Sequence, residues 1–191
     1  MIQIRKNIFE TNSSSVHALC ISRESLWPDE VDKKYFEEWR KEHKPICIHR
    51  GDYGRQPMAT LYTFEAKINY LWTAVVDCYY CFYPELKEGD PEKIQWWKEQ
   101  LLSIAPINSY FKDVEEEHKN EWCGIDHSYN IRNFLKECEK NPKYIFALLD
   151  DNSFIEVTGD EYPNFIYAFL PYIQEELYTM PGGYDVYVKG C

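Results

Sequence analysis

The feature that most constrains the fold is an apolar segment from about Thr60 to Tyr83, in the middle of a 191-residue chain. Its apolar residues recur at the three- and four-residue spacing of an α-helix. Its richest stretch, residues 68–76, is far short of the ~20 residues that span a bilayer. We therefore predict a buried central helix that ends at Pro84, with one face formed by Ile68, Leu71, Val75, Cys78 and Phe82.

Shorter patterns on both sides of this segment predict strands and further helices. The expected strands cover residues 2–9, 16–22, 46–48, 144–149, 154–158 and 184–188. The other expected helices cover residues 27–44, 90–106, 128–140 and 161–177, and a turn at residues 150–153 would make a hairpin of the strands around it. Without a repeat or linker, residues 1–191 form a single α+β domain, in which a small, mostly antiparallel sheet packs with four or five helices.

Charge is unevenly distributed along the chain, whose net charge is −11. Residues 1–60 hold 10 basic and 9 acidic residues, whereas residues 61–191 hold 11 basic and 23 acidic residues. This balance argues against direct binding of nucleic acid, because phosphates need a basic surface. The densest acidic run, with Glu115, Glu116 and Glu117, is either a solvated face or a surface that competes for a basic groove on a nucleic-acid-binding protein.

The most unusual local sequence is the polar loop Glu10-Thr-Asn-Ser-Ser-Ser15, which is followed by Val16 and His17. Its hydroxyl and amide groups could hold an anion such as phosphate. They could equally satisfy their own backbone in Ser/Thr and Asx turns. In a strand, His17 shares a face with Leu19 and Ile21, so we expect it to be at least partly buried. It would be a hydrogen-bonded core histidine, or else a catalytic residue or metal ligand.

Asp126-His127-Ser128 is a second polar cluster. Consecutive residues rarely form a catalytic triad, because the chemistry needs side chains that converge in space. Asp126 and His127 could instead meet Glu10 or His17 from another element, which would suit general acid–base catalysis or a divalent metal.

Four further residues, Cys47, His49, Cys78 and Cys81, could in principle bind zinc. Cys78, however, falls on the core face of the predicted helix, where buried free thiols are common. We therefore predict no metal site, and the sequence assigns no cofactor.

The segment Phe9-Glu-Thr-Asn-Ser-Ser-Ser-Val-His17 resembles the opening of a family of uncharacterised proteins from phages, prophages and Gram-positive gut bacteria. Ala18 stands where that family has Ser or Thr, and Arg55 stands where relatives often have an aromatic residue. The resemblance extends loosely to residues 51–54, 125–128 and 158–160, and it implies a mobile-element setting without an established activity. If these motifs converge, the site would hold Glu10, Asn12, Ser13, Ser14, Asp52 and Asp160 as ligand-binding residues, with His17, Asp126 and His127 as catalytic residues.

Three functions stay open. The first is a phage-type accessory protein that inhibits a host nucleic-acid-targeting defence, an anti-CRISPR-like role. It would bind a basic partner such as a Cas effector through Glu115, Glu116 and Glu117, and the 17% aromatic content would suit an interface. The second is a small enzyme or ligand-binding protein for a phosphorylated or nucleotide substrate, which would use residues 10–17 with Asp126 and His127.

The third function is a structural or chaperone-like interaction protein, which a large exposed apolar patch would favour. The first residues contain no uninterrupted apolar stretch of the kind found in secretion signals. We therefore predict a cytoplasmic protein with reduced thiols. The oligomeric state stays open.

Overall fold

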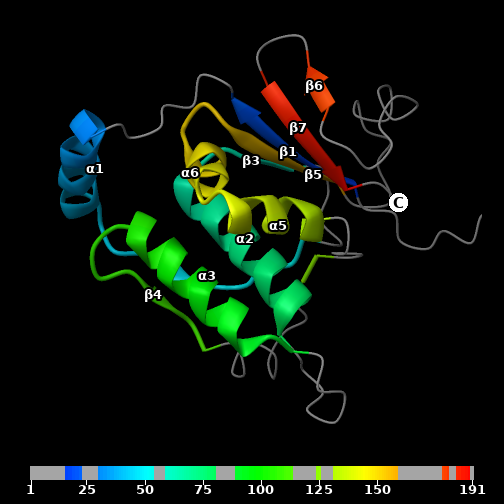
Figure 1. Cartoon of the computed structure of the whole chain (residues 1–191), viewed down its shortest axis with the longest axis horizontal. Coiled ribbons are helices and arrows are strands. Elements are labelled where there is room, and N and C mark those ends of the chain that lie inside the picture. Colours follow the sequence, from blue (N-terminus) through cyan, green and yellow to red (C-terminus); the bar gives the residue numbers. More distant parts are fainter. Residues whose placement is uncertain are drawn as a thin grey trace, which may run out of the picture.

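The computed structural model describes residues 16–22, 30–53, 59–80, 89–113, 124–125, 131–158, 178–180 and 184–189. They form an α+β fold (Figure 1). The elements are β1 (Val16–Ser22), α1 (Glu30–Glu42), β2 (Cys47–Ile48), β3 (Ala59–Leu61), α2 (Phe64–Tyr79), α3 (Pro91–Ile104), β4 (Tyr110–Phe111), α5 (Ile131–Lys140), α6 (Lys143–Leu149), β5 (Phe154–Thr158), β6 (Tyr178–Met180) and β7 (Tyr184–Lys189). The predicted α+β class is confirmed.

The main sheet is antiparallel, with the strand order β3-β5-β1-β7-β6. The short strands β2 and β4 make a separate parallel pair. Helices α2, α5 and α6 lie across one face of the main sheet (Figure 1). The central strand β1 carries Leu19 and Ile21 in the core with these helices, as the two-residue period of a strand requires.

Helix α2 is the centre of the molecule, and every residue from Lys67 to Val76 is buried. It begins later than predicted because residues 59–61 form a strand and Thr63 caps the helix, its Oγ1 accepting a hydrogen bond from the backbone N–H of Ala66 at 3.2 Å. The predicted central helix is confirmed. Its expected end at Pro84 is wrong, because the helix ends at Tyr79 and the backbone of Tyr80 is already extended.

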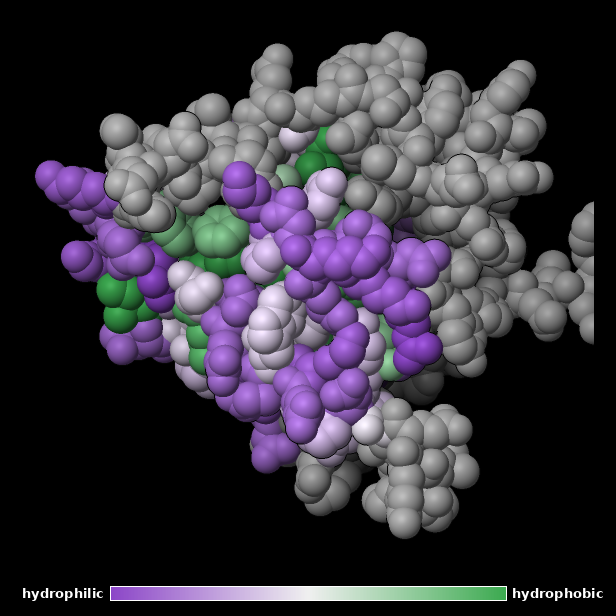
Figure 2. Space-filling model, in the orientation of Figure 1, coloured by the Kyte–Doolittle hydropathy of each residue, from purple (hydrophilic) through white to green (hydrophobic). Residues whose placement is uncertain are grey.

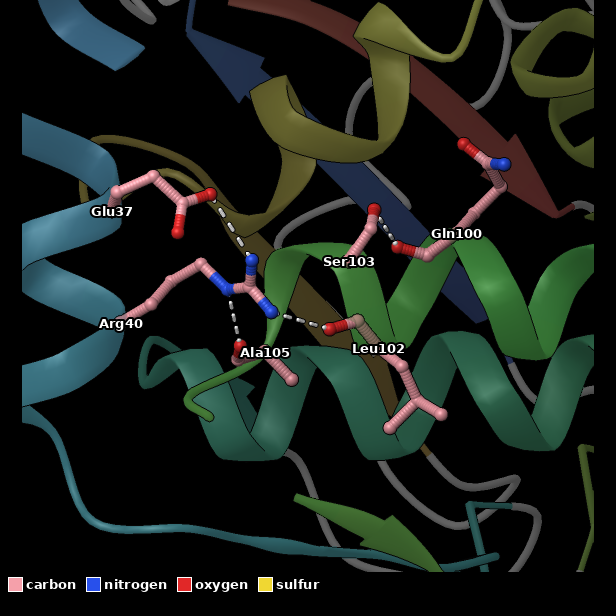
Figure 3. Close-up of polar contacts among 6 residues, drawn as sticks. All are labelled: Glu37, Arg40, Gln100, Leu102, Ser103 and Ala105. Atoms are coloured by element: carbon pink, nitrogen blue, oxygen red, sulfur yellow. Dashed lines mark hydrogen bonds and ion pairs between the residues drawn. The ribbon is translucent and has the colours of Figure 1, made fainter. Parts of the chain in front are cut away.

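Helix α3 is closed at both ends by side chains. At its start Asp90 accepts a hydrogen bond from the N–H of Lys93 at 3.0 Å, ahead of a proline in the first turn, as predicted. At its end Arg40 of α1 donates to the carbonyl oxygens of Leu102 (3.0 Å) and Ala105 (2.8 Å), as Figure 3 shows. These carbonyls have no partner within the helix, so the guanidinium ties α1 to α3.

The strand predicted at residues 144–149 is wrong, because residues 143–149 form helix α6. The turn at residues 150–153 therefore joins a helix to β5 and makes no hairpin. A short apolar run suits a buried helix as well as a buried strand, and in this run Ile145, Ala147, Leu148 and Leu149 are all buried. Strands β3, β4 and β6 were not predicted, and the strand expected at residues 2–9 and the helix expected at 161–177 lie outside the described residues.

A buried lysine of α2 holds the turn between α6 and β5. Lys67 is fully buried, and its Nζ donates to the carbonyl oxygens of Asp150 at 2.5 Å and Ser153 at 2.9 Å. Burial lowers the pKa of Lys67 from 10.5 to about 8, an effect that the charges of Asp151 and Asp150 partly oppose. The side chain of Ser153 completes the turn, since its hydroxyl donates to the carbonyl of Ala147 and accepts from the N–H of Ser22.

Replacing Lys67 with Met should lower the free energy of unfolding by about 2–4 kcal/mol at neutral pH, because two buried carbonyls lose their donor. The difference in free energy of unfolding between the wild type and this variant should grow between pH 8 and pH 10.5. In this range the unfolded chain still binds the proton that Lys67 releases in the folded chain. Urea unfolding at two pH values measures both effects. Lys41→Met, an exposed change on α1, is the control, and equal stability of the two variants would contradict the prediction.

Candidate functional site

The candidate site is a polar network along one side of α2. Asn69, Tyr70, Thr73 and Asp77 recur at three- and four-residue spacing, so they lie on neighbouring positions of the helix surface. They contact β1, residues 49–51 and residues 124–125, which are far apart in the sequence. The network therefore includes His17, which follows the polar loop at residues 10–15. It also includes Ile125, which directly precedes the Asp126-His127-Ser128 cluster.

The first contact joins β1 to α2. The hydroxyl of Tyr70 lies 2.7 Å from Nδ1 of His17, and both side chains are fully buried. Burial raises the pKa of Tyr70 well above its usual value, with further contributions from Tyr53, Cys78 and Asp77. The phenol therefore keeps its proton, and its hydroxyl shares a hydrogen bond with Nδ1 of His17. The expected burial of His17 is confirmed.

The second contact fixes the segment that follows β2. Asn69 binds His49 twice: its Oδ1 accepts from the backbone N–H of His49, and its Nδ2 donates to Nε2 of the imidazole, both at 3.1 Å. Nδ1 of the same ring donates to the carbonyl of Arg50 at 2.8 Å. The backbone N–H of Gly51 donates to Oγ1 of Thr73 at 3.0 Å. Residues 49–51 are thus held on α2 by directional bonds.

The third contact is made by Asp77, which joins two segments. Its Oδ1 pairs with Nη2 of Arg50 at 2.8 Å, and its Oδ2 accepts from the backbone N–H of Ile125 at 2.6 Å. The two charged side chains are only 3% (Arg50) and 11% (Asp77) exposed. A Cβ on Gly124 would lie 3.1 Å from Oδ2 of Asp77, so this close approach favours glycine.

The two segments held by Asp77 also bind each other. The N–H of Gly124 donates to the carbonyl of Gly51 at 3.0 Å, and the N–H of Tyr53 donates to the carbonyl of Gly124 at 2.9 Å. These bonds make a parallel bridge between Asp52 and Gly124. The ring of Tyr53 packs edge-on against Tyr70 with centroids 5.0 Å apart, which links this junction to the His17 contact.

The structure thus places His17 and Asp52 in one network. Asp126 and His127 follow Ile125 directly in sequence, but they lie outside the described residues. The same holds for Glu10, Asn12, Ser13, Ser14, Asp160, Glu115, Glu116 and Glu117. Convergence of the motifs at one site stays a prediction.

The sequence analysis missed the residues of α2 that organise the network. Their signal is present, since Asn69, Thr73 and Asp77 are polar residues at helical spacing within the most apolar segment of the chain. A buried polar group needs a hydrogen-bonding partner. Such residues therefore indicate where other segments dock on the helix.

Metal and membrane features can be assessed for the described part of the chain. Those residues contain no group of three or more His, Cys, Asp or Glu side chains placed to bind a metal ion. Cys47 and Cys78 are free thiols, and Cys81 lies outside the described residues. None of the described helices is long and apolar enough to cross a bilayer.

Comparison of the chain with protein-family models, with curated proteins and with solved structures gives no match.

Replacing Asp77 with Asn should lower the free energy of unfolding by about 3 kcal/mol, because the buried Arg50 loses its counter-charge. Amide exchange at Ile125 should become faster, since its acceptor is weakened. Chemical denaturation and hydrogen exchange measure these effects. Glu92→Gln, an exposed change on α3, should alter neither, and an Asp77→Asn protein of wild-type stability would contradict the structural role.

Proposed function

We propose that this protein acts by binding a basic partner, as a mobile-element inhibitor of a host system that targets nucleic acid, such as a CRISPR–Cas effector. The observation that carries the proposal is the excess of acidic residues over residues 61–191, 23 against 11 basic ones. Electrostatic steering accelerates the association of an acidic protein with a basic channel. The resemblance of residues 9–17 to phage and prophage proteins supports the same setting.

The burial of His17 favours binding over catalysis. A general acid or base must reach its substrate directly or through one water. The imidazole of His17 is fully buried, and its Nδ1 is already occupied by Tyr70. In this arrangement His17 fastens β1 to α2.

The described surface also favours binding through polar residues over binding through a broad apolar surface, as in a chaperone. On the face shown in Figure 2, hydrophilic residues cover most of the described surface, and hydrophobic residues show only as small separate areas. A protein that holds unfolded chains would need a broad apolar patch, and this face supports no such role.

Affinity for a purified Cas effector should fall at least tenfold when the salt concentration rises from about 50 to about 300 mM, because exposed charges are then screened. Neutralising Glu115, Glu116 and Glu117 as glutamines should weaken the complex. The matched control neutralises three exposed acids of α1 instead, Glu37, Glu38 and Glu42. Absence of binding at low salt, or equal effects of the two triple variants, would contradict the proposed role of the acidic run.

A second candidate function, binding of a phosphorylated or nucleotide ligand, is favoured by the junction that Asp77 makes. This junction places Asp52 beside Gly124, two residues before Asp126 in sequence. If the junction belongs to a ligand site, millimolar ATP should shift the amide resonances of Gly51 and Gly124. Asp52→Asn should change the affinity, and spectra that ATP leaves unaltered would exclude this function.

A further inference from the structure

One edge of the main sheet is open among the described strands. Strand β3 pairs with β5 on one side, and the described part of the chain places no strand on its other side. Successive residues of an antiparallel strand direct their N–H and C=O groups to alternate sides. Among Ala59, Thr60 and Leu61, at least one residue therefore presents both groups at this open edge. Such an edge can take up an extended segment of another chain by strand addition.

An exposed aromatic side chain stands at the end of this edge. Tyr62 follows β3 directly and is 63% exposed, and its ring lies 6.0 Å from that of Phe154, the first residue of β5. Exposed tyrosines are favoured at protein interfaces because they combine a large apolar area with a hydrogen-bonding group. The face of such a ring also attracts Lys and Arg side chains.

The charges around Tyr62 are acidic. Glu65 lies in the first turn of α2, and Asp150 and Asp151 lie in the turn that precedes β5. The nearby basic side chain, Lys67 of α2, is buried and donates to backbone carbonyls of that turn. Glu156 lies opposite Thr60 in the sheet register and is half-buried. The exposed carboxylates closest to Tyr62 in sequence and in the sheet register are those of Glu65 and Asp151.

The exposed bases of α5 and α6 lie elsewhere. Arg132, Lys136 and Lys140 are exposed and recur every four residues along α5, so they share one face, and Lys143 begins α6. Lys143 is at the opposite end of α6 from Asp150. At physiological salt only charges within about 8 Å act strongly, so a basic segment on β3 would respond mainly to the charges nearest to it.

We infer that the β3 edge, from Ala59 to Tyr62 with Glu65 and Asp151 beside it, docks an extended Lys- or Arg-bearing segment of a protein partner. The segment would add a strand to β3 through its backbone. Its basic side chains would contact the ring of Tyr62 and the two carboxylates. This inference rests on the proposed function, since it names the surface through which a basic partner is held.

The test uses a synthetic peptide of about ten residues that alternates Lys with Thr, titrated into the full chain at low salt and followed by amide chemical shifts. The largest shifts should fall at residues 59–62 and on β5, and a peptide with Glu in place of Lys should not bind. Tyr62→Ala should weaken binding about fivefold. Tyr35→Ala, which removes a 73% exposed tyrosine from α1, should leave it unchanged.

A paired variant keeps the test independent of Tyr62. The double variant Glu65→Gln with Asp151→Asn should weaken binding of the Lys peptide several-fold. The control, Glu92→Gln with Glu99→Gln on α3, makes the same change of charge at exposed positions and should leave binding unchanged. The inference is overturned if the peptide does not bind, if its shifts map elsewhere, or if the test and control variants behave alike.

The proposed function is tested separately, by measuring the binding of a Cas effector. An effector complex that forms in a salt-dependent way but is unaffected by Tyr62→Ala would overturn this surface and leave the function standing. A Lys peptide that docks on β3 while no effector binds would support the surface and reject the proposed partner.

Discussion

Most of the fold depends on α2, a helix buried on every side that nevertheless carries polar side chains. Each buried polar group left without a partner costs about 1–3 kcal/mol. The segments around α2 are therefore the ones that satisfy it. Lys67 fixes the turn between α6 and β5, Asn69 and Thr73 fix residues 49–51, and Asp77 fixes residues 124–125. The helix thus determines which loops dock and where.

The attachment of these segments to α2 changes the interpretation of the polar motifs. His17 is unusual in the sequence, yet in the fold its ring bonds to Tyr70 and is closed to solvent. The junction between Asp52 and Gly124 is likewise part of the attachment to α2. What remains accessible includes exposed bases along α5 and, near Tyr62 in sequence and register, the carboxylates of Glu65 and Asp151. We therefore place the proposed function on the surface and give the described part of the network a structural role.

The elements predicted correctly are those whose signals are local. The apolar period of α2, the Asp90 cap of α3 and the alternation of β1 each specify their own segment. Helix α6 was missed because the apolar run of six residues at 144–149 fits a buried strand equally well. Strand β3 is defined by its pairing with β5, which local pattern does not show. The same limit applies to the site: the spacing of Asn69, Thr73 and Asp77 identifies a helix face, but only the fold shows that residues 49–51 and 124–125 bind to it.

The most direct test of this account is a Tyr70→Phe variant, measured for both stability and affinity for a Cas effector. The change removes one hydroxyl, and with it the hydrogen bond between Tyr70 and Nδ1 of His17. We predict that the free energy of unfolding falls by about 1–2 kcal/mol while the affinity of the folded protein for the effector is unchanged. A variant of wild-type stability that no longer binds the effector would contradict the account, because the His17 network would then serve function directly.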